Sequence, residues 1–416
     1  MTYRLRSCCA AVAISLLSWA GLGGTAASAQ ELEVMHWLTS GGESASLAVV
    51  RRAFADQGGV WRDATVPGGS AARAAAVNRI LGGNPPPVFL FSLGAQLTEL
   101  SAHGLIVPVP GADEGWDAML PPLLSRSARY QGRYMAAPLN IHGENWMFYN
   151  RAVLEAAGLP VPGSWPEFLE TAARLKAMGK TPIAMGGQPW QERLLFNAVL
   201  LGVGGRDFYR RLYTSLDPAA LDSPTLLDAF RTFASLRAFV DEGSPGRRWN
   251  QATAMLMRGD AVFQFMGDWA KGDMRAAGLE PGREIGCALA PAPDPAYIMV
   301  VDAFAFTAPR DEATGEAQRR FVSVLMDKDV QARLNQAKGS IPVRTDVPDD
   351  GFDACARQAM ALIRDPATHL PSTGLFGMSG GLSGAVDDAI SHFWNDPRLT
   401  PEQGQELLRK SILAFR

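Results

Sequence analysis

The sequence predicts an α/β protein that is divided into two domains. In its first part, short apolar runs and helical patterns follow one another in the order β-α-β-α-β-α, which typically produces a parallel sheet with helices on its faces. The chain has 416 residues, more than a single hydrophobic core usually holds. An extended stretch that contains Pro138 and Gly143 has the composition of a crossing between domains.

The first predicted strand and the turn that follows it organise the first domain. Residues 32–35 form an apolar strand that stops at a polar, glycine-containing turn, and residues 44–54 carry apolar side chains at helical spacing. Open α/β sheets bind ligands where a strand ends and the next helix begins. We therefore expect Trp37 and Glu43 to project into a ligand crevice.

The later elements follow from apolar patterns, caps and helix stop signals. Asn150 is expected to cap one helix, and Ser164 with Glu167 forms a capping-box pattern at the start of the next. The expected strands cover residues 60–66, 88–91, 134–141, 181–185, 261–266 and 299–307, and the expected helices include 71–81, 95–101, 151–157, 315–326 and 329–337. The chain thus leaves the first domain near Ile141, returns near Met299 and leaves again near Val343.

The first 29 residues have the pattern of a signal peptide. Two arginines precede an apolar run at residues 10–22, and Ala27-Ser28-Ala29 offers a small-residue cleavage site. The apolar run is too short for a membrane anchor, and no later stretch is apolar enough to span a bilayer. We expect cleavage near Ala29 and export of a soluble protein.

The cysteines give a second prediction that depends on export. Cys8 and Cys9 lie within the signal, so the exported chain keeps Cys287 and Cys355. In an oxidising compartment the simplest expectation is one disulfide between them. Two separate buried thiols are the alternative.

Composition and missing motifs exclude several classes of function. The net charge is −3, and it becomes more negative when Arg4 and Arg6 leave with the signal, so nothing favours nucleic acid or an anionic membrane. The chain has no nucleophile elbow, zinc-protease motif or phosphate loop, and its five histidines lack metal-ligand spacing. Paired carboxylates of a glycoside hydrolase are a three-dimensional feature, so that class stays open.

Three residues near predicted element ends could carry binding chemistry. Asp302 lies in an apolar strand and marks a turn at the strand end, an internal ion pair with a structural arginine, or an acceptor for ligand hydroxyls. Lys338 ends a helix, where a lysine is usually a solvated cation. Trp269 follows a buried strand, with Asp268 as the expected helix cap, and is either a core residue or a stacking platform for a sugar ring.

Several segments, taken in order, resemble the periplasmic sugar-binding proteins of bacterial ABC importers, specifically their glucose/mannose-binding branch. The resemblance runs from about Glu31 to the end of the chain. It is carried by His36-Trp37, Thr39 to Glu43, Gly83 to Pro86, Pro138 to Asn150, Gly267 to Lys271, the strand around Asp302, and Lys338 to Asp346.

The resemblance implies a two-lobed periplasmic-binding-protein fold, in which each lobe is a β-sheet flanked by helices and crossing hinge segments join the lobes. Residues 30–141 and 300–342 then form the N-terminal lobe, and residues 142–299 and 343–416 form the C-terminal lobe. The pair Cys287 and Cys355 also resembles a disulfide of this branch.

By position, the resemblance makes Glu43, Asp302 and Lys338 partners of sugar hydroxyls and lets Trp37 and Trp269 stack on the ring. The full expected ligand-binding set is Trp37, Leu38, Thr39, Glu43, Leu90, Ser92, Trp269, Asp302, Lys338 and Phe376, with no catalytic residue, metal or cofactor.

Departures from the branch bear on the ligand. The branch has a tryptophan where this chain has Leu38, polar residues where Leu90 and Ser92 align, and a histidine where Phe376 aligns. Because a site that is built to bind hydroxyls loses discrimination when its donors are lost, free glucose is not the expected ligand.

The expected function is a monomeric, non-enzymatic periplasmic receptor that delivers a sugar or glycoside-like molecule to an inner-membrane ABC permease. Three alternatives stay open. They are an ordinary glucose- or mannose-binding protein, a secreted carbohydrate-active enzyme, and a sensory protein that hands its ligand to a receptor kinase.

Overall fold

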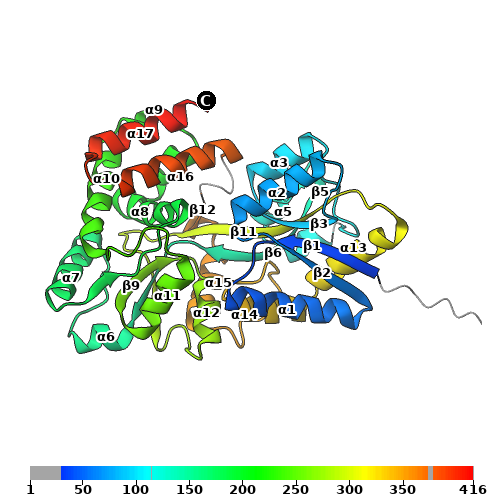
Figure 1. The fold of residues 1–416 in the computed structure, drawn as a ribbon, viewed down its shortest axis with the longest axis horizontal. Coiled ribbons are helices and arrows are strands. Elements are labelled where there is room, and N and C mark those ends of the chain that lie inside the picture. Colours follow the sequence, from blue (N-terminus) through cyan, green and yellow to red (C-terminus); the bar gives the residue numbers. More distant parts are fainter. Residues whose placement is uncertain (1–29, 114, 373–377, 416) are drawn as a thin grey trace, which may run out of the picture.

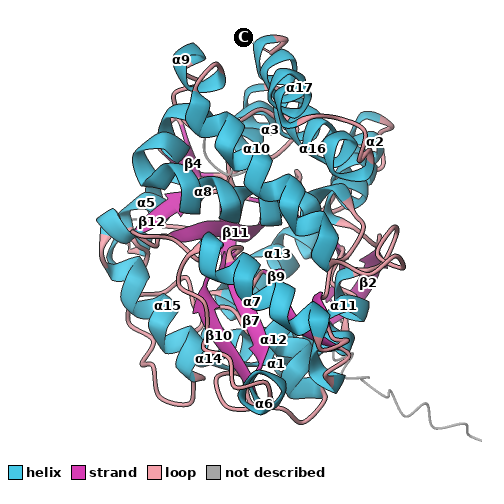
Figure 2. Cartoon of the chain, turned by 90° about the vertical axis from the view of Figure 1, so that its left-hand side faces the viewer, coloured by secondary structure: helices cyan, strands magenta, loops and turns pink. Residues whose placement is uncertain are grey.

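The computed structural model describes residues 30–113, 115–372 and 378–415, and two sheets with flanking helices organise them (Figures 1 and 2). The predicted α/β class is confirmed. The strands are β1 (Gln30–His36), β2 (Gly59–Thr65), β3 (Val88–Ser92), β4 (Arg129–Tyr130), β5 (Arg133–Tyr134), β6 (Ala136–Gly143), β7 (Trp146–Asn150), β8 (Thr181–Ile183), β9 (Ala261–Met266), β10 (Ile285–Leu289), β11 (Tyr297–Phe306) and β12 (His369–Pro371).

The helices of the first half are α1 (Gly41–Asp56), α2 (Gly69–Leu81), α3 (Ala95–Ala102), α4 (Trp116–Met119), α5 (Pro122–Ser127), α6 (Arg151–Ala156), α7 (Trp165–Ala177) and α8 (Pro189–Tyr213). Those of the second half are α9 (Pro218–Leu221), α10 (Pro224–Leu236), α11 (Trp249–Arg258), α12 (Ala270–Ala276), α13 (Glu312–Leu325), α14 (Lys328–Lys338), α15 (Ala354–Arg364), α16 (Gly380–Asn395) and α17 (Pro401–Leu413). Two short 3₁₀ turns cover Arg237–Phe239 and Pro366–Thr368.

The first sheet is only partly parallel. Strand β1 pairs in parallel with both β2 and β3, as the alternating pattern predicts, but β11 runs antiparallel to β3 and to β6. The short strand β12 extends β11 in parallel beside its first three residues. The second sheet has the order β10-β7-β9-β8.

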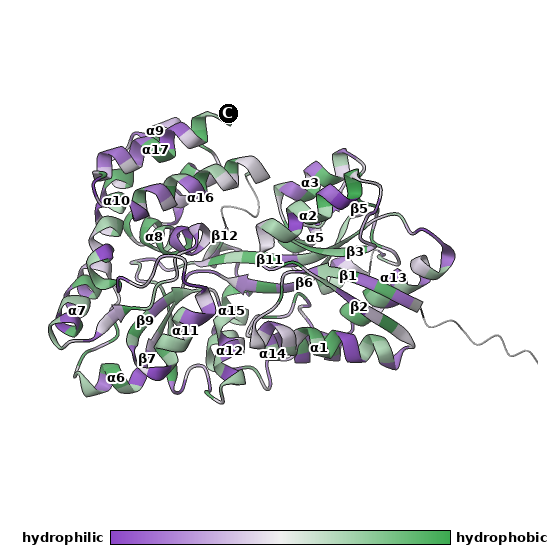
Figure 3. Ribbon diagram, viewed as in Figure 1, coloured by the Kyte–Doolittle hydropathy of each residue, from purple (hydrophilic) through white to green (hydrophobic). Residues whose placement is uncertain are grey.

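Two large clusters of buried side chains lie around the two sheets, although the first also includes Trp146 and Phe148 of β7. Val34 and Phe89 belong to the first cluster, and Phe168 and Phe196 belong to the second. Figure 3 shows that the central strands are mostly hydrophobic, whereas outer helices such as α17 also carry hydrophilic residues. None of the helices among the described residues is long and apolar enough to cross a membrane.

Strands β6 and β11 lie side by side through the middle of the molecule (Figure 1). From β6 the chain enters the second sheet at β7, and from β10 it returns to the first sheet at β11. The side chain of Asn145 joins these two crossings, because its amide nitrogen donates to the carbonyl of Ala296 and its oxygen accepts from the amide of Ile298, at 2.8 and 2.9 Å.

The lobe boundaries stay a prediction. Segments assigned to the C-terminal lobe also contact the first sheet: β12 adds a strand to it, and Ala270 and Met274 of α12 belong to the first cluster. Helix α12 packs against α1 and α14. At that contact Gly42 and Gly272 leave no room for a side chain, since a Cβ on Gly42 would lie 2.4 Å from the backbone of Gly272.

The expected disulfide is confirmed. Cys287 of β10 and Cys355 of α15 are bonded, with their Cα atoms 6.1 Å apart. The Cys355 side chain is completely buried. The bond therefore fastens α15, which follows the last crossing, to the edge of the second sheet.

Removing this bond should lower stability substantially. A disulfide that closes a loop of 68 residues stabilises by about 4 kcal/mol in the chain-entropy model. We expect the double variant Cys287→Ser with Cys355→Ser to unfold at markedly lower urea concentration than the oxidised protein. Reduced wild-type protein is the matched control, and an unchanged midpoint in either sample would contradict this account.

Candidate ligand-binding site

The sheet register brings three polar side chains together at the centre of the molecule. Asp302 of β11 lies opposite Ser92 on β3 and opposite Asn140 on β6. Directly paired residues present their side chains on the same face of a sheet. Register shifts between Asp302 and Ala303, and such an irregularity re-aims the local side chains. Ser92, the last residue of β3, thus lies beside Asp302, and Asn140 lies on the opposite side of Asp302.

Asp302 forms a buried ion pair with Lys338. Its Oδ2 lies 2.7 Å from the lysine Nζ, and the two side chains are only 9% and 1% exposed. Burial alone raises the pKa of the Asp302 carboxyl, but the charge of Lys338 and the nearby imidazole of His142 lower it well below its usual value. Lys338 is therefore not the solvated cation that usually ends a helix, and its expected contact with a ligand stays a prediction.

His142 connects this pair to the second sheet. Its Nδ1 hydrogen-bonds the Oδ1 of Asp268, which follows β9. Its Nε2 lies 2.6 Å from the amide nitrogen of Asn140 and 3.6 Å from the Oδ2 of Asp302. Nδ1 thus faces a carboxylate, and Nε2 faces both the amide of Asn140 and the carboxylate of Asp302. The Oδ1 of Asn140 is buried and accepts no hydrogen bond from any described residue.

Asp268 does not cap the helix that follows it, so that expectation is wrong. Helix α12 begins after Trp269 without a side-chain cap. The second carboxylate oxygen of Asp268 accepts from the amide of Gly143 and from the hydroxyl of Tyr297, each at 3.0 Å. Burial and the charge of Asp268 raise the pKa of Tyr297. The Asp268 carboxylate therefore holds the backbone of the crossing at Gly143 and does not cap α12.

Two tryptophans flank the buried cluster. The ring of Trp269 lies edge-on to His142 at 5.2 Å and 5.9 Å from the ring of Trp190. Both tryptophans are only partly buried, as is Trp37 after β1. Each keeps apolar surface for a ligand, and Trp190 was not expected from the sequence.

Glu43 stabilises the start of α1. Its Oε2 accepts from the backbone amides of Thr39 and Ser40 at 3.0 and 2.9 Å, and Ser40 accepts in return from the amide of Glu43. This is a capping box at the start of α1. The pattern Ser-Gly-Gly-Glu at residues 40–43 carries that signal, which the sequence analysis missed.

The remaining expected residues are spread over different environments. Leu38 and Leu90 are buried in the first cluster, at 2% and 1% exposure, and offer no surface to a ligand in this conformation. Ser92 is partly buried and Thr39 is exposed. Phe376 lies outside the described residues.

A second buried cluster holds the first crossing segment. The carboxylate of Glu144 pairs with Arg193 of α8 at 3.1 Å and accepts from the hydroxyl of Ser372 at 3.0 Å. Arg193 also pairs with Asp387 of α16 at 2.6 Å. Burial raises the pKa of Asp387, and the charge of Arg193 only partly offsets this effect. In the described part of the chain, no group of three or more His, Cys, Asp or Glu is arranged to hold a metal ion.

Comparison with known sequences identifies the family. Residues 47–332 match the profile of the bacterial extracellular solute-binding proteins. The chain belongs to this family. The resemblance seen in the sequence is therefore confirmed at the family level, and the glucose/mannose branch stays a prediction.

Relatives of this solute-binding protein agree in length and name. It is 37% identical to a probable sugar-binding periplasmic protein of Brucella suis over 91% of both chains. A protein of the same name from Rhizobium meliloti is also 37% identical, over 93% of this chain and 95% of its own. A solved chitin oligosaccharide binding protein matches 92% of this chain and 98% of its own at a TM-score of 0.80 and 18% identity, which supports the fold alone.

Neutralising Asp302 should leave a buried, unpaired lysine in this solute-binding protein. We expect Asp302→Asn to lose about 3–5 kcal/mol of unfolding free energy, because the charge of Lys338 then lacks its partner. The control is Asp346→Asn, which removes a more exposed pair with Arg344 at 2.7 Å and should cost less than about 1 kcal/mol. Urea unfolding measures both, and equal losses would contradict the assignment.

The ion pair of Asp302 and Lys338 should also make the unfolding free energy depend on pH under acidic conditions. The pKa of Asp302 is lowered on folding, so its contribution is complete above the ordinary Asp pKa of about 4 and is lost as the pH falls below it. The stability difference between wild type and Asp302→Asn should therefore shrink below about pH 4. Urea titrations across this range test the sign, and a constant difference would refute it.

Proposed function

We propose that the protein captures a sugar or sugar-containing molecule between its two lobes and delivers it to an inner-membrane ABC permease. The observation that carries this proposal is the buried pair of Asp302 and Lys338, set beside the unsatisfied oxygen of Asn140 and the partly exposed rings of Trp190 and Trp269. The family and the names of the relatives support the same class of ligand.

The chemistry of these groups suits a polyhydroxylated ring. A hydroxyl group both donates and accepts, so one hydroxyl can bridge the carboxylate of Asp302 and the ammonium of Lys338. Hydrogen bonds to ionised groups are stronger than those between neutral groups. The tryptophan rings supply flat apolar area against the C–H face of a sugar.

Ligand capture also needs the lobes to move. The groups that would touch the ligand are nearly inaccessible in this conformation, since Lys338 is 1% exposed. We infer that the lobes separate by bending at the crossings near Gly143 and Tyr297, where β6 and β11 pass between the sheets. A ligand that contacts both lobes binds the closed state more tightly than the open state, and its binding therefore shifts the equilibrium toward the closed state.

We further propose that the ligand is a substituted glycoside or another sugar-containing molecule and not free glucose. Leu38 and Leu90 are core residues here, so neither position supplies the polar contact that the resembled branch has. Phe376 offers no hydrogen bond either. The alternative is glucose or mannose, with Asn140 and His142 replacing the missing partners.

The cellular setting belongs to the same proposal. The relatives are named as periplasmic binding proteins, and the signal pattern suits export with cleavage near Ala29. We propose a monomer that needs no cofactor and performs no catalysis. Both central carboxylates, Asp268 and Asp302, are engaged by buried partners, which does not favour a pair of free catalytic acids.

A thermal-shift screen against monosaccharides, oligosaccharides and glycosides tests the function. A true ligand at 100 times its Kd should stabilise the protein by about 2.7 kcal/mol. For that ligand, Trp269→Ala should weaken binding by about tenfold, because stacking area is lost. The matched control is Trp61→Ala, a partly buried tryptophan on β2 that packs against Phe321 and should leave affinity unchanged.

Different results would reject different parts of the proposal. Equal affinities in the two tryptophan variants would exclude the assigned stacking surface. Tight binding of free glucose would exclude the altered ligand but keep the receptor. Turnover of nitrophenyl glycosides by wild-type protein that disappears in Asp302→Asn, in a sample shown to be folded by circular dichroism, would establish the enzyme alternative.

A further inference from the structure

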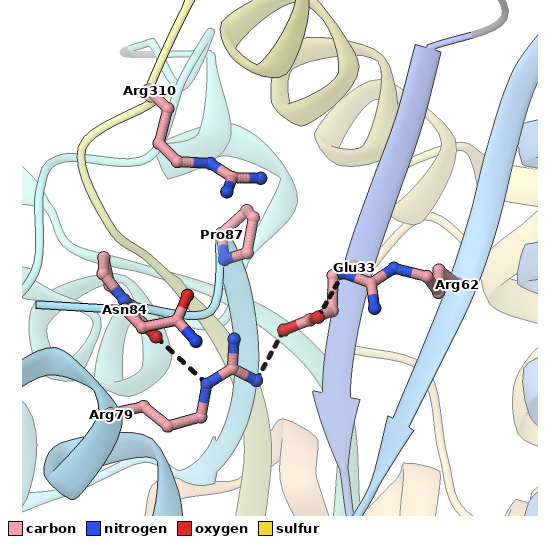
Figure 4. A pocket seen from close by; sticks show the side chains of 7 residues that line it. Glu33, Arg62, Arg79, Asn84, Pro87 and Arg310 are labelled. Carbon is pink, nitrogen blue, oxygen red and sulfur yellow. Dashed lines mark hydrogen bonds and ion pairs between the residues drawn. The ribbon is translucent and has the colours of Figure 1, made fainter. Parts of the chain in front are cut away.

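A separate pocket lies in the first lobe, away from the cluster around Asp302 (Figure 4). Its volume is about 190 Å³, and its lining comes from β1, β2, α2, the loop before β3 and the segment after β11. The lining residues are Glu33, Arg62, Arg79, Asn84, Pro85, Pro87 and Arg310. Three of the seven are arginines and one is a carboxylate, so the lining itself is positively charged.

Glu33 holds two of these arginines in place. It lies opposite Arg62 in the register of β1 and β2, and its carboxylate forms ion pairs with Arg62 and, at 2.6 Å, with Arg79. Arg79 also donates through Nε to the backbone carbonyl of Asn84 at 3.0 Å. Because Glu33 is buried, its charge requires such partners. The two guanidinium groups are thereby fixed at the pocket wall.

The arginines keep donors that Glu33 does not use. Nη2 of Arg79 and Nη1 of Arg62 bond to no residue that the structure describes, and Figure 4 shows the free nitrogen of Arg79 directed into the pocket. Arg310 extends over Pro87 toward the same space (Figure 4). Within the described ranges it forms neither an ion pair nor a hydrogen bond, and it is exposed at the surface.

The charged side chains of the pocket lining leave a positive excess. Glu33 offsets one arginine, and the exposed Glu31 pairs with Arg62 at 2.7 Å. Arg310 is left without an ion pair among the described residues, although local hydrogen bonds and the charge of Arg310 lower the pKa of the neighbouring Asp311. Glu33 carries a single negative charge, so one of the three arginines is enough to neutralise it. Guanidinium groups match the oxygen geometry of phosphate and carboxylate by paired hydrogen bonds. A neutral sugar would gain much less from this lining.

We propose that this pocket binds a small oxyanion, such as inorganic phosphate or a carboxylate, with Arg310 as its main ligand and Arg79 and Arg62 as supporting donors. A water molecule occupies about 30 Å³ in the liquid, so the pocket has room for one such anion and a few waters. The site is independent of the sugar ligand, because none of its residues contributes to the cluster around Asp302.

Calorimetric titration of the purified protein with inorganic phosphate tests the proposal, with sodium chloride holding the ionic strength constant. Wild-type protein should bind phosphate saturably, and Arg310→Gln should weaken binding by about tenfold, as expected for the loss of a charge-assisted contact. Arg310 has no structural partner among the described residues, so this variant should fold normally. The matched control is Arg52→Gln, an exposed arginine on α1 of the same lobe.

A second titration with acetate separates the two kinds of oxyanion. Saturable binding of either anion that is lost in Arg310→Gln and kept in Arg52→Gln supports the site. The anion with the lower Kd then shows whether the site prefers phosphate or carboxylate. Absence of saturable heat for both anions in wild-type protein would overturn the proposal. Equal weakening in the two arginine variants would also overturn it, since the effect would then be general screening.

Discussion

The buried charge of Asp302 is the constraint on which the centre of the molecule depends. A carboxylate within an apolar strand is unfavourable unless a cation reaches it, and that cation is Lys338 at the last position of α14. The helix must therefore stop there, and it does so with Gly339 in a left-handed conformation at a φ of 87°. A Cβ at Gly339 would lie 2.6 Å from the carbonyl oxygen of Asp268, so the same glycine ends α14 next to Lys338 and permits the close packing of α12 on α14.

The network around His142 ties the two sheets to each other at the same place. Asp268 follows the second sheet, His142 belongs to the first, and the imidazole reaches both Asp268 and the neighbourhood of Asp302. A movement of one sheet relative to the other would therefore change the contacts of His142 with Asp268 and with the central ion pair.

Local sequence patterns predicted most elements of the fold, and the resemblance supplied Asp302, Lys338 and Trp269 of the candidate site but not the contacts between them. The order of elements, the capping box of Ser164 with Glu167 and the disulfide are local or compositional, and the structure has all three. The sequence could not show that β11 runs antiparallel to β3, or that Lys338 folds inward to Asp302, because these pairings depend on distant segments. Leu38 and Leu90 looked like cleft residues by alignment, although apolar residues at strand ends are as readily core. Asn140 and His142 alternate on a strand that is otherwise apolar, and that alternation was the available signal for the polar cluster.

The disulfide has a topological consequence for the pair of Asp302 and Lys338. Asp302 and Lys338 both lie between Cys287 and Cys355 in the sequence, so the bond encloses the two charges in one covalent ring. In the unfolded oxidised chain their mutual distance is limited by that ring, and the conformational search that brings them together is shorter. A single backbone cut between them would leave both halves attached to the rest of the protein. Oxidation of the two cysteines thus helps to assemble and retain the central ion pair, although neither cysteine takes part in it.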